Sequence, residues 1–259
     1  MWRAVGGRSE VSLPERYARW REAFDVAARS SLRPDMAILD VGAGRHPTIP
    51  IAARPARCAY VGLDLSAAEL ADAPRGSYDE GVVSDVVAFR PELADRFDLA
   101  LSMMVFEHVR PLPAALDNIH AYLRPGGALV ALTSGTFAPF ALANRLLPAG
   151  LSRAIQKTLL GKNPATIFPA HYDRCWDSAL RKALANWGEV QVIPLYLGAT
   201  YLNFAPPLRS VYLLYEEWTR RGDHRNLASH YVLHAKKAGS VRAETEPGIA
   251  SESRKAGEV

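Results

Sequence analysis

The amino-acid sequence predicts an α/β fold in which helices cover both faces of a mostly parallel sheet. Three observations indicate this class. Short apolar runs alternate with helical stretches, a glycine turn follows the first run, and acidic residues stand at the ends of several runs. Such alternation is typical of parallel strands, which need crossover segments between them. The 259 residues suffice for one large domain or two small ones.

The first predicted element is a helix within residues 1–35 that covers the core. Ser12, Pro14 and Glu15 form a capping box at its start. Its apolar residues recur at helical spacing on one face, and they are Tyr17, Trp20, Phe24 and Ala27.

Seven apolar runs are predicted to be strands of one domain over residues 36–240. They are residues 36–41, 59–63, 81–87, 97–103, 128–133, 190–195 and 230–235. A further helix is expected near residues 177–187. The tail at 241–259 contains few large apolar residues, so we expect it to be disordered.

Two insertions, at about 134–172 and 198–228, are expected to be helical and to form the acceptor side. In the second, a helix after Pro206 and Pro207 is predicted to carry an apolar face of Leu208, Val211, Tyr212, Tyr215 and Trp218. Such faces are most often core. The alternatives are an apolar acceptor pocket or a surface that rests on a membrane.

Charge and cysteine content bear on the expected partners, metal sites and location of the protein. The 31 Lys and Arg residues against 27 Asp and Glu give a net charge of +4 without a basic run, so nucleic acid is not an expected partner. Cys58 and Cys175 lack partners at metal spacing, and no metal site is expected. Without a secretory signal or a long apolar stretch, the chain is expected to be cytoplasmic, or peripheral to the inner face of the membrane.

The strongest motif is the turn after the first strand, which contains Gly42 and Gly44. Glycine permits close approach of a ligand to the main chain. A dinucleotide-binding fingerprint would have a third glycine where this chain has Pro47.

Carboxylates follow at the ends of the next two strands. Asp64 lies twenty residues after Gly44, where a carboxylate can accept hydrogen bonds from the hydroxyls of a ribose, and Asp85 closes the third strand. One such Asp alone could be a helix cap. Several, together with a glycine turn, favour a nucleoside ligand.

Over roughly residues 36–133, these segments resemble the class I S-adenosylmethionine-dependent methyltransferases, and among them the group called methyltransferase type 11. The matching segments are 39–44 (LDVGAG), 62–64 (GLD), 84–85 (SD), 97–102 (FDLALS) with 105–109 (VFEHV), and 123–127 (LRPGG). The resemblance implies a Rossmann-like, doubly wound sheet of seven strands with the last strand antiparallel. The helical insertions would then follow strands 5 and 6.

The resemblance also implies S-adenosyl-L-methionine as cofactor and assigns its contacts. Gly42 and Gly44 would pass under the methionine moiety, and Asp40 would orient its ammonium group. The remaining expected cofactor residues are Asp64 and Leu65 at the ribose, Asp85 at the adenine amine, Ser102 and Met103 near the methyl group, and His108. The segment 45–50 departs from the family pattern because it is rich in proline, so the first helix is expected to be short or displaced.

The expected reaction is methylation of a small-molecule or lipid- or glycan-linked acceptor at oxygen, with His171 as the candidate base. The competing interpretation of its neighbourhood is that His171 is exposed and Asp173 caps the following helix. The alternatives for the whole chain are an NAD-dependent oxidoreductase and a non-catalytic scaffold that binds S-adenosylmethionine.

Overall fold

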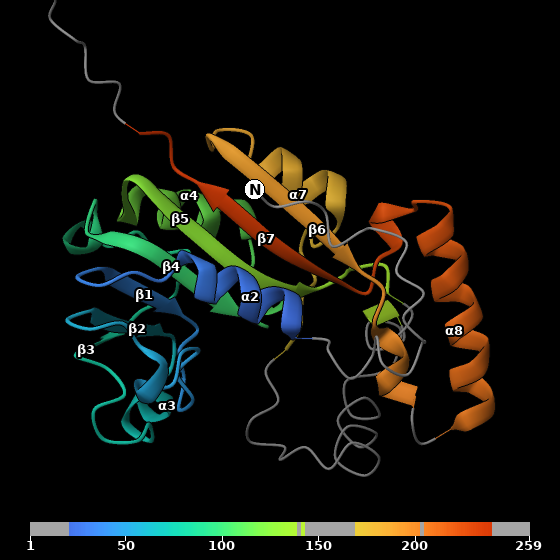
Figure 1. Ribbon diagram of the computed structural model, residues 1–259, viewed down its shortest axis with the longest axis horizontal. Helices are drawn as coiled ribbons and strands as arrows, with labels where there is room; N and C mark the ends of the chain where they lie inside the picture. Colours follow the sequence, from blue (N-terminus) through green and yellow to red (C-terminus); the bar gives the residue numbers. More distant parts are fainter. Residues whose placement is uncertain (1–20, 139–140, 143–168, 203–204, 240–259) are drawn as a thin grey trace, which may run out of the picture.

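A seven-stranded sheet forms the centre of the computed structural model, which describes residues 21–138, 141–142, 169–202 and 205–239 (Figure 1). The strands are β1 (Ala37–Val41), β2 (Ala59–Asp64), β3 (Glu80–Val83), β4 (Phe97–Met103), β5 (Leu123–Ser134), β6 (Glu189–Leu195) and β7 (His230–Lys236). Their order is β3-β2-β1-β4-β5-β7-β6. The first five strands are parallel, and β7 is antiparallel to β5 and β6. The predicted fold class and antiparallel last strand are confirmed.

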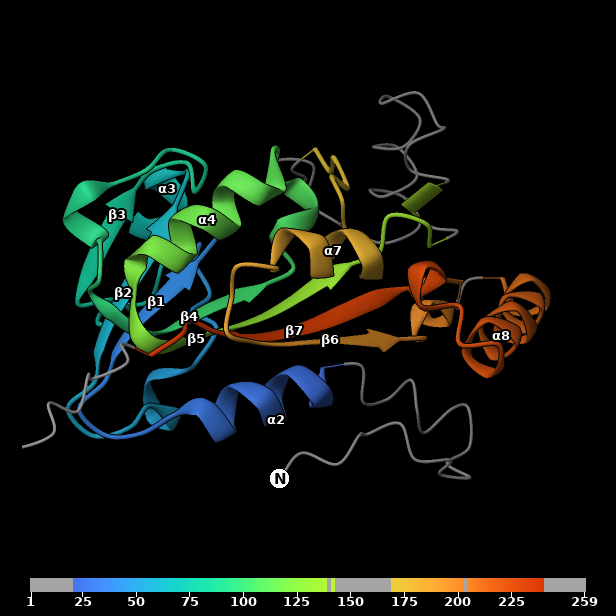
Figure 2. The same cartoon turned by 90° about the horizontal axis from the view of Figure 1, so that it is seen from above.

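Helices lie on both sides of this sheet. They are α2 (Glu22–Ser31), α3 (Ala67–Ala71), α4 (Leu112–Tyr122), α7 (Asp177–Ala183) and α8 (Pro206–Arg221). Short 3-10 turns are η1 (Ile51–Ala53), η2 (Pro91–Leu93), η3 (Phe106–His108), η5 (Gly198–Leu202) and η6 (Arg225–Leu227). Figure 2 shows α2 against one face and α4 and α7 against the other. The capping box at Ser12, most of the first insertion and the tail at 241–259 lie outside the described residues.

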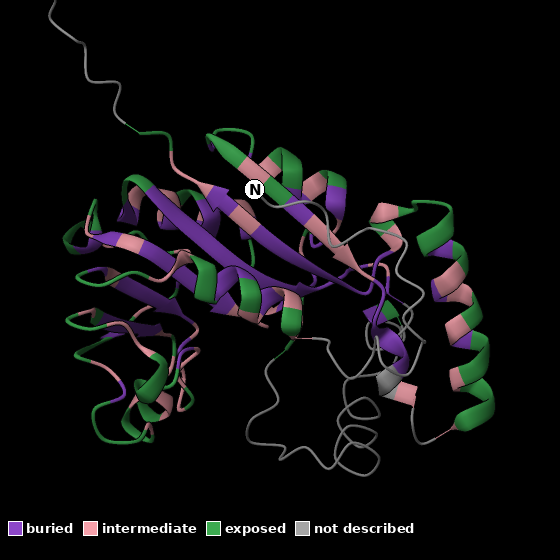
Figure 3. Cartoon of the chain, in the orientation of Figure 1, coloured by how far each residue is buried: buried purple, intermediate pink, exposed green. Residues whose placement is uncertain are grey.

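Successive residues of the central strands enter two separate layers of core. In β1, Ile38 packs in the same cluster as Phe24 of α2, whereas Leu39 and Val41 join the cluster that contains α4 and α7. The sheet is therefore buried on both faces (Figure 3). This double burial explains why its strands appear in the sequence as nearly continuous apolar runs.

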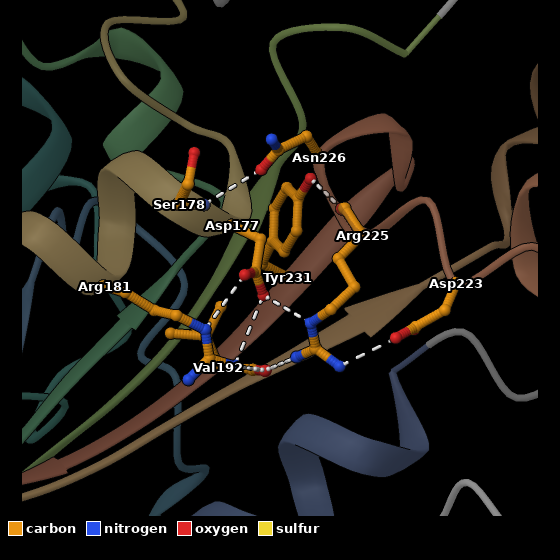
Figure 4. A network of polar contacts seen from close by, with 8 residues as sticks. All are labelled: Asp177, Ser178, Arg181, Val192, Asp223, Arg225, Asn226 and Tyr231. Carbon is orange, nitrogen blue, oxygen red and sulfur yellow. Dashed lines mark hydrogen bonds and ion pairs between the residues drawn. The ribbon is translucent and has the colours of Figure 1, made fainter.

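A buried carboxylate and its partners connect the elements at the β6 edge of the sheet (Figure 4). Asp177, at the start of α7, accepts hydrogen bonds from Nε of Arg181 at 2.9 Å and Nε of Arg225 at 3.0 Å. Both guanidinium groups also donate to the carbonyl oxygen of Val192 in β6, at 3.0 and 2.7 Å. The hydroxyl of Tyr231 donates to the carbonyl of Arg225 at 2.7 Å. This carboxylate and its two arginine partners thus join α7, β6 and the turn before β7.

The helix of the second insertion is present, but its predicted apolar face is only partly buried. Tyr212 is buried, whereas Leu208, Val211 and Trp218 are exposed. The buried face also contains Glu216, whose carboxylate accepts a hydrogen bond from the amide of Gly198 at 2.6 Å. The core interpretation of this face therefore holds for Tyr212 and not for Leu208, Val211 and Trp218.

Acidification is predicted to destabilise the fold through His230. Burial lowers the pKa of this imidazole to about 4, whereas an unfolded histidine titrates near 6.5. Between these pH values the unfolded chain binds the extra proton, so the free energy of unfolding falls as the pH falls, by roughly 3 kcal/mol at most. Burial also lowers the pKa of His120 and His234, which add a smaller dependence of the same sign.

Urea unfolding of the wild type and of His230→Gln at several pH values between about 7.5 and about 4.5 measures this contribution. We expect the variant to have the shallower pH dependence. His171→Gln serves as the control because His171 is exposed, and it should keep the wild-type slope. Equal slopes in all three proteins would contradict the assignment.

Candidate cofactor site

The predicted site residues meet where the strand order changes direction. β1 lies between β2 and β4, so the crossovers from β1 and β4 leave in opposite directions along the sheet. Ligands of open α/β sheets bind in the crevice outside the carboxyl ends of the strands at such a point. The register places Val41 beside both Leu63 and Ser102, so the turn after β1 lies between the ends of β2 and β4.

The turn that contains Gly42 and Gly44 has a backbone that favours glycine. Their φ angles are +69° and +54°, in the left-handed region. The amide of Gly42 donates to the carbonyl of Leu63 at 2.8 Å. A Cβ atom added to Gly42 would overlap the side chain of Val105, which follows β4. Both the angle and the close packing therefore exclude a side chain at Gly42.

Asp64 is held in a fixed orientation at the end of β2. Its Oδ2 accepts the amide of Gly44 at 2.9 Å, and its Oδ1 accepts the amide of Ser66 at 2.8 Å. A carboxylate has about four lone-pair positions, so about two remain for a ligand. Asp64 is partly exposed, as a residue that binds ribose hydroxyls must be.

The neighbouring positions at this edge are also accessible. Leu65 is 67% exposed, and Asp85 is exposed with one oxygen accepting the amide of Val87 at 3.1 Å. An apolar side chain in this position can cover the ring of a bound adenosine, and a carboxylate can accept its amine. The residues present thus fit the nucleoside part of S-adenosylmethionine.

Asp40 lies beneath the glycine turn. Its side chain is fully buried, and burial raises its pKa. One oxygen accepts the amide of Thr48 at 2.7 Å and the hydroxyl of Tyr60 at 2.8 Å, while the other accepts the hydroxyl of Thr48 at 2.6 Å. Asp40 therefore anchors the loop after the glycine turn, and any influence on the methionine ammonium group would act through that loop; the predicted contact stays a prediction.

The chain forms no α-helix between Gly44 and β2, a segment that is described throughout. Only the 3-10 turn η1 occurs there, which agrees with the expectation that the proline-rich segment shortens or displaces the first helix. Dinucleotide-binding sheets place the pyrophosphate against the N-terminus of this helix. Because that N-terminus is missing here, the geometry disfavours the NAD-dependent alternative.

An ion pair fixes the glycine turn to α3 instead. The guanidinium group of Arg45 donates to both carboxylate oxygens of Glu69, at 2.8 and 2.5 Å, and it lies 3.4 Å from Asp72. The hydrogen bonds from Arg45 lower the pKa of Glu69. The hydroxyl of Tyr78 also reaches the turn, 2.9 Å from the carbonyl oxygen of Gly44. These contacts could not be predicted from the sequence, because no helix or strand period relates positions 45 and 69.

The methyl-proximal positions at the end of β4 differ in exposure. Ser102 is fully buried, and its Oγ has no hydrogen-bond partner among the described residues. Met103 is half-buried and reaches the surface. Met103 is thus accessible to a ligand, whereas Ser102 leaves a polar atom unsatisfied just beneath the crevice.

Glu107, in the η3 turn that follows β4, connects this edge of the sheet to the segment that carries His171. Its buried carboxylate accepts the hydroxyls of Thr133 and Ser134, each at 3.1 Å, and burial raises its pKa. Its backbone carbonyl accepts the amides of His171 and Tyr172, each at 2.8 Å. The segment that carries His171 is thereby attached to the carboxyl edge of the sheet, and no pattern in the sequence indicates this contact.

The two candidate histidines lie on either side of this attachment. His108 is half-buried, and its Nδ1 is 2.9 Å from the carbonyl oxygen of Pro169. His171 is exposed. Asp173 accepts the amide of Leu112 at 3.0 Å and so caps the preceding helix α4. The interpretation that Asp173 caps the following helix was therefore wrong.

Replacing Gly42 with Ala is predicted to abolish binding of S-adenosylhomocysteine, because the new Cβ would displace Val105 and the turn. Gly126→Ala is a matched control, since Gly126 has a φ of +80° and no atom within 4 Å of a Cβ position. The control should lose about 1–2 kcal/mol of stability from backbone strain and keep its affinity. Calorimetric titration measures the affinity of each variant for S-adenosylhomocysteine, and thermal melts measure its stability. Equal affinities in the two variants would contradict the assignment.

Comparison with known proteins agrees with this geometry. A family model described as "Methyltransferase domain" matches residues 13–188. The sequence matches none of the curated proteins. Among solved structures, the fold is similar to phosphoethanolamine N-methyltransferase 2 of Haemonchus contortus, with a TM-score of 0.51 and 13% identity over 85% of this chain and 53% of that one. The chain spans about half the length of that protein.

A second similar structure is an S-adenosylmethionine-dependent methyltransferase from Mesorhizobium loti, with a TM-score of 0.47 and 18% identity over 85% of this chain and 98% of that one. The family model covers more than half of the sequence, in the same region as the glycine turn and the strand-end carboxylates. The chain belongs to the class I S-adenosylmethionine-dependent methyltransferases.

Proposed function

We propose that this methyltransferase acts on an oxygen atom of a small-molecule acceptor, or of an acceptor linked to a lipid or glycan. One observation carries the proposal. The exposed His171 is attached, through its own amide, to the carbonyl of Glu107 immediately after β4. A potential base is thus anchored at the edge where the cofactor residues lie.

S-adenosylmethionine supplies an activated methyl group when it is bound. The task of the protein is then to align the acceptor with that group and to exclude water, and such positioning can contribute roughly 7–11 kcal/mol. Gly42 and Gly44 offer the backbone against which the cofactor lies, and Asp64 fixes the ribose end. Met103 and the segment after Pro169 form the side from which an acceptor enters.

A hydroxyl acceptor is the type that benefits from a base beside it. A neutral imidazole can remove the hydroxyl proton near neutral pH, whereas an amine or thiolate acceptor can react without such help. The Glu107 attachment limits the backbone movement of His171 but leaves its ring free to turn toward an acceptor. This combination favours His171 as the base.

His171→Ala is predicted to lower kcat by about a hundredfold or more, the usual size of a general-base contribution, while the affinity for S-adenosylhomocysteine stays unchanged. The assay transfers a labelled methyl group to a panel of sugar, phenol and lipid hydroxyls, and mass spectrometry locates the methylated atom. His224→Ala, an exposed histidine at the far end of α8, is the control.

Unchanged turnover in His171→Ala would remove this residue from the mechanism. Methylation at nitrogen, carbon or sulfur instead would overturn the proposal for oxygen. Neither result would affect the assignment of the cofactor site, which the Gly42 variant tests separately.

A further inference from the structure

Helix α8 exposes an apolar face on the surface of the molecule. Leu208, Val211, Leu214 and Trp218 are 52, 63, 73 and 56% exposed. Their spacing of three, three and four residues places them along one side of the helix. Figures 1 and 2 show α8 at one end of the molecule, beyond β6 and β7. Exposed apolar side chains gathered in this way mark an interaction site.

An adjoining side of α8 packs against the protein. Tyr212, Glu216 and Thr219 are buried there, and Tyr212 joins an apolar cluster with Leu197 and Ala199. The carboxylate of Glu216 accepts the amide of Gly198 at 2.6 Å. Because these contacts fix the rotation of the helix, its apolar face points away from the described core.

The charges beside this face are mainly positive toward solvent. Arg220 and Arg221 both pair with Glu217, at 2.5 and 2.7 Å. The side chain of Arg221 is 75% exposed, whereas that of Glu217 is only 20% exposed. Two guanidinium groups therefore share one largely covered carboxylate. The exposed carboxylate of Asp223, in the turn after the helix, pairs with Arg225 at 3.9 Å, so the outward surplus at this end of α8 is the charge of one guanidinium group.

We propose that this face of α8 rests on an anionic phospholipid membrane. An apolar face flanked by arginines is typical of helices that lie in the plane of the membrane interface. Trp218 contacts Tyr215, with 6.2 Å between the ring centroids, and both aromatic residues have the amphipathic character found at that depth. The guanidinium groups at the end of the helix match the negative lipid headgroups.

A second copy of the chain is a less suitable partner for this face. A stable protein interface usually involves about 20–30 residues on each side, whereas the exposed apolar side chains here come from a single helix. A membrane needs only a narrow apolar face of this kind. None of the helices in the described part of the chain has the length and apolar character needed to cross a bilayer, so the contact would be peripheral.

The position of α8 would bring the acceptor side toward the lipid. β7 begins at His230, which pairs with Ser134 and Leu195 at the carboxyl edge of β5 and at the end of β6. The segment from α8 into β7 therefore returns to the sheet at the edge where the candidate cofactor residues lie. A lipid-linked acceptor would be reached from this side. This consequence rests on the proposed function, but the membrane contact of α8 is independent of it.

The test is co-flotation of the full chain with vesicles of equal parts phosphatidylglycerol and phosphatidylcholine, and with vesicles of phosphatidylcholine alone. We expect binding to the anionic vesicles that weakens as salt is added. The combined variant Val211→Ser, Leu214→Ser and Trp218→Ser should bind at least about tenfold more weakly. Val26→Ser with Phe89→Ser, which are exposed apolar residues elsewhere, should bind like the wild type.

Thermal melts and titration with S-adenosylhomocysteine verify that each variant is folded with its cofactor site intact. Absence of wild-type binding to anionic vesicles would overturn the proposal, as would equal binding by the α8 variant. Sedimentation of the wild type as a dimer that dissociates in the α8 variant would also overturn it, by assigning the face to a second copy of the chain.

Discussion

A carboxylate buried without exposure to water must receive hydrogen bonds from the protein, and Asp40 receives three of them. Their donors are Thr48 and Tyr60, so this interaction fixes the course of the chain immediately after the glycine turn. In most doubly wound sheets a helix performs that task. Here the cofactor edge depends on a buried acid that supports a loop, and loss of any of these partners would leave an unsatisfied polar group in the core.

The contacts above this anchor connect the glycine turn to its neighbours. Gly44 donates to Asp64, and Arg45 binds Glu69 of α3. The carboxylate of Asp64, the glycine backbone and the α3 helix are consequently parts of one hydrogen-bonded unit. Because the unit contains no helix N-terminus pointed at a phosphate, it suits a nucleoside attached to a sulfonium amino acid better than a dinucleotide.

The strands and the positions of most cofactor residues could be predicted because burial on both faces makes the strands apolar throughout and places their polar residues at the ends. The role of Asp40 could also have been inferred, since it lies two residues after Ile38 and so faces the same buried layer. Other features had no such signal. Periodicity identified α8 as amphipathic, but its contacts with distant residues, such as Glu216 with Gly198 and Tyr212 with Leu197, determine which side is buried. The Glu107 attachment joins residues more than sixty positions apart.

The proposed acceptor side and the candidate cofactor edge meet at the end of β4, where Met103 precedes the η3 turn that holds Glu107. The central claim, that the edge beside this turn binds a nucleoside sulfonium cofactor, is tested most directly by calorimetric titration of the full chain with S-adenosylhomocysteine and, separately, with NAD. We predict saturable binding of S-adenosylhomocysteine and no binding of NAD. Saturable binding of NAD without binding of S-adenosylhomocysteine would contradict it.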